Sequence, residues 1–424
     1  MAVGNRLKSG EESLTTAPLQ QGPDRAILQG VTILDLTTEL VGPYSTRLLG
    51  GFGAEVIKVE APRRGDPARS WPPFPDDLPH PEKSGMFLHL NLNKKGVTLN
   101  LHCATGRKIL LDLIRRADIL VEGLRPPERE ALGLEYSATS QLNPMLVHTS
   151  VTPFGTTGPY RDYQVTDVMV YAMGGQMTTQ GQPDREPVNL ATNVVLYMAA
   201  LQVALGTMGA FLAVESLGRG QHVDVSMVEA LSSSADGRTN ALVQYQFSGE
   251  NTRRTREGVR GFPFGIYPCA DGYVFLWGTG FWPQSVKMLG MPELLNDPRF
   301  CTPEAQTQPG HREEFDAILL PWLLARTKKE IWKAGMEAGI LLSPLNTTLD
   351  TLADPHFQER GAWATVEHPV MGKVTVPGRP ILMSEGPWRI TRPAPLLGQD
   401  NEEVLGRLGY GRQDLVRLRA AGVI

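Results

Sequence analysis

Short apolar runs alternate with amphipathic segments in the first part of the chain. Residues 31–36 (VTILDL) are β-branched and apolar, which is typical of a buried strand. Residues 44–50 then predict a helix and residues 54–60 (AEVIKVE) a second strand, and Gly42-Pro43 is expected to break the first strand. A strand, a helix and a strand in close succession form a βαβ unit, which implies a parallel sheet.

The same alternation continues to about residue 230. Further strands are predicted over residues 97–101, 118–121, 146–151 and 222–226, and a helix over residues 105–116. Strands that alternate with helices favour a doubly wound domain with helices on both faces of the sheet. The fold class is therefore predicted to be α/β, with a doubly wound first domain.

Residues 194–217 (VVLYMAALQVALGTMGAFLAVESL) form the longest apolar stretch. They predict a helix in the core of a soluble domain rather than a membrane span, because Gly206 and Gly209 interrupt the run and Glu215 lies near its end.

The rest of the chain is predicted to form a linker, a smaller α/β region and a C-terminal segment punctuated by proline and glycine. Residues 237–262 are polar and Arg-rich, a strand is predicted from residue 273 to 277, and a helix from 401 to 408. The expected division is an extension over 1–29, a large domain over 30–236, a linker and small domain over 237–350, and a C-terminal segment over 351–424.

Composition excludes several classes of protein. The chain has 424 residues, a net charge of −4 and a pI near 6.1, so no global charge favours nucleic acid or an anionic membrane. Three widely spaced cysteines and no CxxC pair argue against a disulfide framework or a zinc site, and a reducing cytoplasm is expected. No metal is expected, because the histidines are not at ligand spacing; those considered are His222, His356 and His368.

Seven segments, in order along the chain, resemble the class III CoA-transferases. They begin with GVTILDLTTELVGPYSTRLLGGFGAEVIKVEAPRRGDPAR and include LGRGQHVDVSMVEA and APLLGQDNEEVLGRLG. The seven segments cover residues 30–69, 90–101, 117–136, 143–160, 217–230, 353–372 and 394–409.

This resemblance implies an architecture and an activity. It implies a large Rossmann-like domain built from both chain ends, so residues 351–424 are expected to return to the large domain. Two such chains, each also with a small α/β domain, are expected to interlock as a dimer. The family moves coenzyme A between carboxylic acids, so acyl-CoA and a small acid are the expected substrates, with no covalently bound cofactor. In the family an aspartate attacks the acyl-CoA thioester, which is nucleophilic catalysis in two easier steps.

The nucleophile position departs from the family. Counting back from Gly218, which opens the GRGQ turn, places the family's aspartate at Leu196, and Asn193 three residues earlier is not an acid either. Leucine has no lone pair with which to attack a thioester, so no catalytic residue is expected at this position. The resemblance then implies a homologous, Asp-bearing partner subunit that completes the site.

Asp167 is the fallback nucleophile, because it stands in a segment that lines the active site in family members. Its alternative role is that of a structural or capping aspartate. Racemase members carry a histidine just before this aspartate, and Thr166 occupies that place here. Racemisation needs an acid and a base across one carbon, so this reading is disfavoured.

Residues for binding CoA are also altered. Gly123-Leu124 replace a common Asn-Phe pair, and Ala131 replaces a common arginine, the side chain best suited to phosphate. The remaining candidates are Arg63, Arg64, Lys94, Lys95, Leu99 and Arg125, with solvated charges or plain core packing as the alternatives.

The sequence therefore predicts one subunit of a CoA-transferase. Within the family it resembles the subunit of the benzylsuccinate CoA-transferases that lacks the aspartate, which would place it in anaerobic toluene degradation. Trp277, Phe281 and Trp282 could contact an aromatic acid or pack in a core. Two alternatives stay open: a self-sufficient transferase or lyase that uses Asp167, and a non-catalytic scaffold that binds acyl-CoA.

Overall fold

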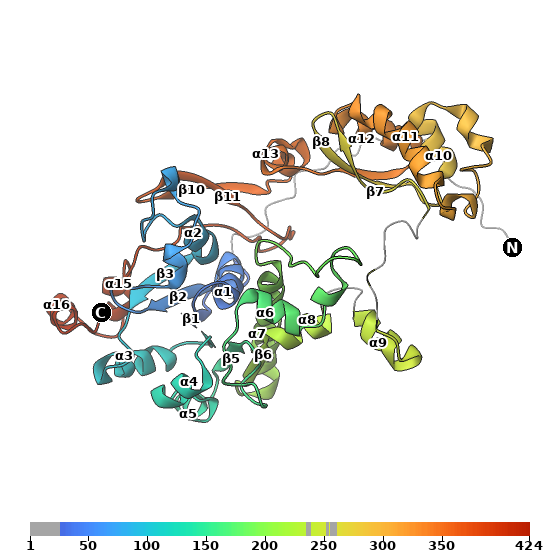
Figure 1. The fold of residues 1–424 in the computed structure, drawn as a ribbon. Helices are drawn as coiled ribbons and strands as arrows, with labels where there is room; N and C mark the ends of the chain where they lie inside the picture. The colour runs from blue at the N-terminus through green and yellow to red at the C-terminus, as the bar shows by residue number, and fades with distance from the viewer. Residues whose placement is uncertain (1–25, 235–238, 252–253, 255–260) are drawn as a thin grey trace. The chain divides into compact units, whose positions relative to one another are not determined.

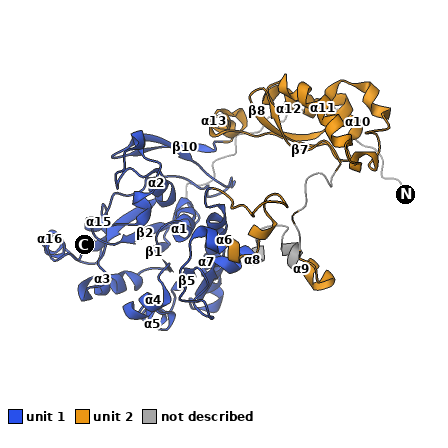
Figure 2. Ribbon diagram, in the orientation of Figure 1, with its two compact units in different colours: residues 1–170, 192–233, 361–424 blue, residues 171–191, 234–360 orange. Residues whose placement is uncertain are grey.

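The computed structural model describes residues 26–234, 239–251, 254 and 261–424. They form two compact units (Figure 2): the first comprises the described residues up to 170 together with 192–233 and 361–424, and the second comprises residues 171–191 and the described residues within 234–360. Residues 171–191 group with the second unit, although the sequence pattern predicts them within the large domain. Most of the expected extension, residues 1–25, lies outside the described residues.

The first unit is built on a six-stranded parallel sheet with the strand order β3-β2-β1-β4-β5-β6 (Figure 1). The strands are β1 Thr32–Leu36, β2 Glu55–Glu60, β3 Lys94–Thr98, β4 Ile119–Glu122, β5 Val147–Thr152 and β6 His222–Ser226. The order along the sheet reverses between β1 and β4. Such a reversal is a topological switch point, where the loops that follow the two strands separate and leave a crevice.

Helices cover both faces of this sheet, which confirms the predicted α/β class. Helix α1 (Val41–Gly51) and helix α7 (Val194–Leu217) pack on one face, with α2 (Gly85–Asn91) beside α1. Helix α3 (Ala104–Ile114), α15 (Asn401–Gly406) and α16 (Arg412–Ala420) pack on the other. The shorter helices are α4 Pro126–Leu132, α5 Tyr136–Leu142, α6 Asp167–Met173 and α8 Met227–Ser234.

Two local predictions need correction. Strand β3 begins at Lys94, three residues before the predicted strand, because Lys94 and Lys95 belong to the strand even though they are charged. Gly42-Pro43 do not break the first strand, which already ends at Leu36, but lie in the first turn of α1, where proline's missing N–H costs no hydrogen bond. A Cβ on Gly42 would lie 2.2 Å from Thr37, so this turn requires glycine.

Strand β3 is at an edge of the sheet, and the chain's last segment covers that edge. The backbone N–H of Gly96 donates to Asp400 Oδ2 at 2.7 Å, and that of Thr98 donates to Asn401 Oδ1 at 2.9 Å. The outward-facing amides of this edge strand are thus paired with side chains rather than with another strand.

Helix α7 has the bounds that the sequence predicted, but only one of its faces is buried. Val195, Ala199 and Val203 face α1 and the sheet, whereas Leu205 and Leu212 are 68% and 70% exposed. Its length and composition also satisfy the criteria for a membrane-spanning helix.

The second unit packs helices on a small antiparallel sheet, β7 Phe264–Cys269, β8 Gly272–Trp277 and β9 Leu341–Pro344. Its helices are α10 Trp282–Leu289, α11 His311–Leu324, α12 Lys328–Ala338, α13 Thr348–Ala353 and α14 Pro355–Glu359, and α9 Thr239–Ser248 lies in the predicted linker. Trp282 lies in an aromatic core with Phe262 and Phe315. The chain then returns to the first unit through the hairpin β10 Trp363–His368 and β11 Gly372–Pro377.

Candidate active site

A cavity of about 430 Å³ lies at the switch point of the six-stranded sheet. The loop that follows β1 lines it with residues 37–42, and the segments after β4 and β5 contribute Gly123 and Pro153. Open parallel sheets bind their ligands at the carboxyl ends of the strands, at this point of the topology. The cavity is therefore the candidate active site of the first unit.

Leu196 and Asp167 both line this cavity. Leu196 lies in the first turn of α7, where no acidic residue is found, and Asp167 is the first residue of α6. The structure thus brings the expected nucleophile position and the fallback aspartate together from different helices.

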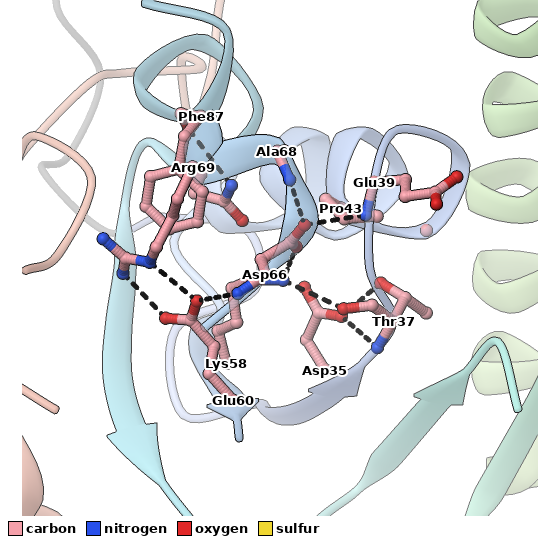
Figure 3. Close-up of polar contacts among 12 residues, drawn as sticks. Asp35, Thr37, Glu39, Pro43, Lys58, Glu60, Asp66, Ala68, Arg69 and Phe87 are labelled. Carbon is pink, nitrogen blue, oxygen red and sulfur yellow. Dashed lines mark hydrogen bonds and ion pairs between the residues drawn. The ribbon is translucent and has the colours of Figure 1, made fainter. Parts of the chain in front are cut away.

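A buried cluster of charges lies beneath the β1–α1 loop (Figure 3). The Lys94 ammonium lies 2.8 Å from Asp35 Oδ2, and Lys58 lies 2.7 Å from Asp66 Oδ2, with all four side chains fully buried. Lys58 also donates to the backbone oxygen of Thr37 at 2.9 Å. Each buried lysine is thus paired with one buried carboxylate, which is the condition under which such groups are tolerated.

The pKa values of the cluster reflect this pairing. Burial alone would raise the pKa of Asp35, but the charges of Lys94 and Lys58 outweigh it and hold that pKa well below its ordinary value. Burial lowers the pKa of Lys94, and Asp35 only partly opposes the effect. Burial would also lower the pKa of Lys58, but the negative charges of Asp66 and Asp35 outweigh burial and raise that pKa.

A second buried pair fixes the loop that follows β2. The Arg69 guanidinium holds Glu60 at 2.7 Å and Glu82 at 2.7 Å, and it stacks 3.8 Å from the centre of the Phe87 ring. Glu60 also accepts a hydrogen bond from the backbone N–H of Asp66 at 2.8 Å. Asp66 is therefore held by Glu60 through its backbone N–H and by Lys58 through its side chain.

Glu39 is a site residue that the sequence reasoning missed. It lines the cavity, has the left-handed φ of 66°, and donates its backbone N–H to Asp66 Oδ1 at 2.9 Å. Burial raises the pKa of the Glu39 carboxyl, and the negative charge of Asp66 raises it further. One signal was available: Glu39 is an acidic residue in the short loop after the first buried strand, and therefore lies near the carboxyl end of that strand.

The predicted CoA-binding residues do not converge on one cavity. Arg125 is exposed and lines the switch-point cavity, 4.0 Å from Glu128. Arg64 lines a separate cavity of about 430 Å³ formed by residues 64–81, and Arg63 lines a third of about 380 Å³. Lys95 is held by Glu55 at 2.5 Å and by Glu403 at 2.6 Å.

The environment of Lys94 does not fit the expected contact with CoA. Its ammonium donates to Asp35, to the Pro43 oxygen at 2.8 Å and to Asn91 Oδ1 at 3.0 Å. These three bonds use all three donors of an ammonium group, so none remains for a phosphate. Leu99 is 1% exposed and lies in the core, as its alternative interpretation held.

The three histidines considered above are dispersed. His222 stacks on Tyr136 and hydrogen-bonds Ser150 Oγ at 2.9 Å, His368 Nδ1 accepts amide hydrogen bonds in the turn after β10, and His356 lies in α14. Within the ranges that the structure describes, no group of His, Cys, Asp and Glu could hold a metal ion.

The sequence profile described as CoA-transferase family III matches residues 28–401. The chain belongs to this family. Its members use acyl-CoA and carboxylic acids as substrates and transfer CoA between acids. This match confirms the resemblance found in the seven sequence segments.

Curated relatives match nearly the whole chain. The succinyl-CoA–D-citramalate CoA-transferase of Chloroflexus aurantiacus is 33% identical, and the match covers 95% of this chain and 99% of the relative. The formyl-CoA:oxalate CoA-transferase of Streptomyces coelicolor is 32% identical (94% and 99%). Subunit BbsE of the succinyl-CoA:(R)-benzylsuccinate CoA-transferase of Thauera aromatica is 32% identical (92% and 97%). These relatives act on different acids.

A solved structure supports the fold. The crystal structure of a CAIB/BAIF family protein from Brucella suis superimposes with a TM-score of 0.81 at 28% identity, and the match covers 90% of this chain and 99% of that one. The arrangement of the transferase fold is therefore shared across most of the chain.

Proposed function

We propose that this CoA-transferase works as the supporting subunit of a heteromer, paired with a homologous chain that carries the nucleophilic aspartate. The observation that carries the proposal is Leu196, which lines the cavity where the family resemblance places that aspartate. A leucine side chain can shape an acyl pocket but cannot form the mixed anhydride through which CoA is exchanged. We place the complex in the cytoplasm, since all three cysteines are free.

The exposed face of α7 supports a partner chain. Leu201, Leu205 and Leu212 are 52%, 68% and 70% exposed on a helix whose opposite face is buried against the sheet. Apolar faces of this kind mark protein interfaces. A homologous subunit is the occupant that we propose, in the interlocked arrangement expected from the family.

For the substrates we propose succinyl-CoA as donor and benzylsuccinate as acceptor, within anaerobic toluene degradation. The support is the match to subunit BbsE, which itself is a subunit of a larger enzyme. Citramalate and oxalate, named for the other relatives, are the alternative acceptors.

A second candidate is a self-sufficient transferase or lyase that uses Asp167. The observation in its favour is that the Asp167 side chain lines the same cavity as Leu196. A third is a scaffold that binds acyl-CoA without turnover, as predicted for a chain with no nucleophile.

The test compares this chain alone with the chain co-expressed with an Asp-bearing homologue, measuring CoA transfer from succinyl-CoA to benzylsuccinate. Transfer by the pair only supports the heteromer, and transfer by this chain alone contradicts it. Asp167→Asn should abolish transfer only under the second candidate, and Asp112→Asn on the opposite face of the sheet is the matched control. Stoichiometric CoA binding without turnover in either sample would favour the scaffold.

Substituting Leu196 itself sharpens this test. The first turn of α7 has no acidic residue, and a carboxylate there would be stabilised by the helix dipole. Leu196→Asp should therefore give the chain transfer activity in the absence of a partner.

A further inference from the structure

Glu39 is held in a backbone conformation that favours glycine. Its φ of 66° is costly for a residue with a side chain, so surrounding contacts must maintain it. They do so through one ion pair: Asp66 accepts the Glu39 N–H at 2.9 Å, and Lys58, bound to Asp66, donates to the Thr37 oxygen at 2.9 Å. The chain on both sides of residue 38 is thus clamped by the buried pair.

This clamp leaves the Glu39 side chain free. Figure 3 shows its carboxylate directed away from the buried ion pairs, while its backbone nitrogen faces Asp66. Within the described residues no hydrogen bond or ion pair engages the carboxylate, whereas the neighbouring cavity carboxylate of Glu128 lies 4.0 Å from Arg125. The Glu39 side chain lines the cavity and is accessible to solvent, so that water can reach it.

The pKa of Glu39 suits a base. Burial and the charge of Asp66 raise it above the ordinary value of a glutamic acid. A carboxylate with a raised pKa accepts a proton more readily than an ordinary carboxylate does.

We propose that Glu39 gives this chain a second activity, hydrolysis of acyl-CoA, by acting as the general base for a water molecule in the switch-point cavity. The inference rests on the proposed function in one respect, that acyl-CoA occupies this cavity. It does not depend on the partner, because water replaces the carboxylate nucleophile that Leu196 cannot supply.

The step balances without any further reactant. Glu39 takes a proton from water as the water oxygen bonds to the thioester carbonyl carbon, and the carbonyl electrons move onto oxygen. The tetrahedral intermediate then breaks its carbon–sulfur bond, and the departing CoA sulfur takes the proton from Glu39. The products are the free acid and CoA, and the glutamate is regenerated.

The start of α1 lies beside Glu39 and can stabilise the oxyanion. Val41 and Gly42 both line the cavity and stand in the first turn of this 11-residue helix. Their N–H groups have no intrahelical carbonyl to bond, and the helix dipole is positive at this end. Donors directed at a developing oxyanion are among the largest contributions to acyl transfer.

The experiment measures CoA thiol release from succinyl-CoA by the chain alone, without an acceptor acid. Glu39→Gln should lower the rate by about 100-fold or more, the usual contribution of a general base. Glu135→Gln is the matched control, since Glu135 is exposed and does not line this cavity, and it should leave the rate unchanged. Thermal melting of both variants confirms that they are folded.

Two further readouts separate a base from a structural residue. The hydrolysis rate of the unsubstituted chain should fall as the pH is lowered, with an inflection at a pKa above that of an ordinary glutamate. This inflection should be lost in Glu39→Gln. A single turnover in ¹⁸O-water should place the label in the product acid. Label in Glu39 itself would overturn the inference, because it would make Glu39 the attacking group.

The inference also fails if the unsubstituted chain releases no CoA, or if folded Glu39→Gln hydrolyses at the original rate. These failures are distinct from failure of the proposed function. Transfer by the heteromer without hydrolysis by this chain overturns only the present inference. Hydrolysis by the chain with no transfer by the pair overturns only the proposed heteromer.

Discussion

The Lys94 ammonium lies 2.8 Å from the Asp35 carboxylate, and both side chains are completely buried. Removing one partner of such a pair leaves an uncompensated charge in the core, at a typical cost of about 3–5 kcal/mol. We expect Lys94→Met to lower the free energy of unfolding by about that amount, measured by urea denaturation.

Lys95→Met is the natural control for this experiment. Lys95 is the next residue of β3, but its ion pairs with Glu55 and Glu403 are partly exposed, and exposed pairs contribute about 0–1 kcal/mol. Equal losses for the two variants would contradict a structural role for the buried pair.

Glu39 should carry measurable backbone strain. Replacing it with glycine removes the penalty of a left-handed residue, about 1–2 kcal/mol, and keeps the amide that Asp66 accepts. We expect Glu39→Gly to raise the free energy of unfolding by about 1 kcal/mol while abolishing hydrolysis. Glu39→Gln keeps the strain and should leave stability near its original value, and an unstable glycine variant would argue against the clamp.

His89 should make stability depend on pH. Burial, aided by the positive charge of Arg47, lowers the pKa of His89 to about 3. The folded state therefore keeps the ring neutral while the unfolded chain takes up a proton below about pH 6.5, so stability falls as the pH drops, by about 1.4 kcal/mol per pH unit. The free energy of unfolding should thus drop more steeply between pH 6.5 and 5 than it does in His89→Gln.

The comparison with His89→Gln isolates the contribution of His89. Burial also lowers the pKa values of His222 and His368, but both residues are present in the two proteins that are compared. Tyr44 and Tyr197 pack around His89 with ring centroids 5.7 and 6.1 Å away, and the glutamine must be shown to preserve this packing by near-ultraviolet circular dichroism. If the unfolding free energies of the two proteins changed with pH in parallel, His89 would be taking up its proton in the folded state over the same pH range as in the unfolded chain.

Assembly should depend on the exposed face of α7. Leu205→Glu places a charge where a partner's apolar surface is expected. We therefore expect the co-expressed chains to be monomeric, as measured by light scattering. Ser216→Glu, at an exposed polar position of the same helix, should leave the assembly intact. An unaltered complex with Leu205→Glu would place the interface elsewhere.

The sequence was informative where hydrophobicity alone decides the structure. Helix α7 has the predicted bounds because its apolar run ends at the Gly218 turn, and β1 differs from its prediction by one residue. Strand β3 begins before its predicted start because Lys94 is charged, and an apolar pattern does not extend a buried strand over a charged residue. The burial of Lys94 depends on Asp35, 59 residues away, and no local pattern records such a pairing.

The candidate site was only partly accessible to sequence reasoning. Leu196 and Asp167 were singled out through family resemblance, and the fold brings them to one cavity. Glu39 was overlooked because what distinguishes it is a backbone angle and a distant anchor at Asp66. The six candidate CoA contacts were chosen largely for charge, and charge alone does not tell a buried structural lysine from a phosphate ligand.

The edge of the sheet at β3 has a consequence for the order of events on the ribosome. All six strands are made by residue 226, but Asp400 and Asn401, which pair with the outward amides of Gly96 and Thr98, are made about 170 residues later. Val404, Leu405 and Leu418 cover the apolar face of the same sheet later still. While the second unit is synthesised, the nascent sheet therefore has one unpaired edge, and one of its faces is covered by α3 but not yet by α15 and α16. The interlocked pair of chains that we propose would therefore have to assemble before this final segment docks.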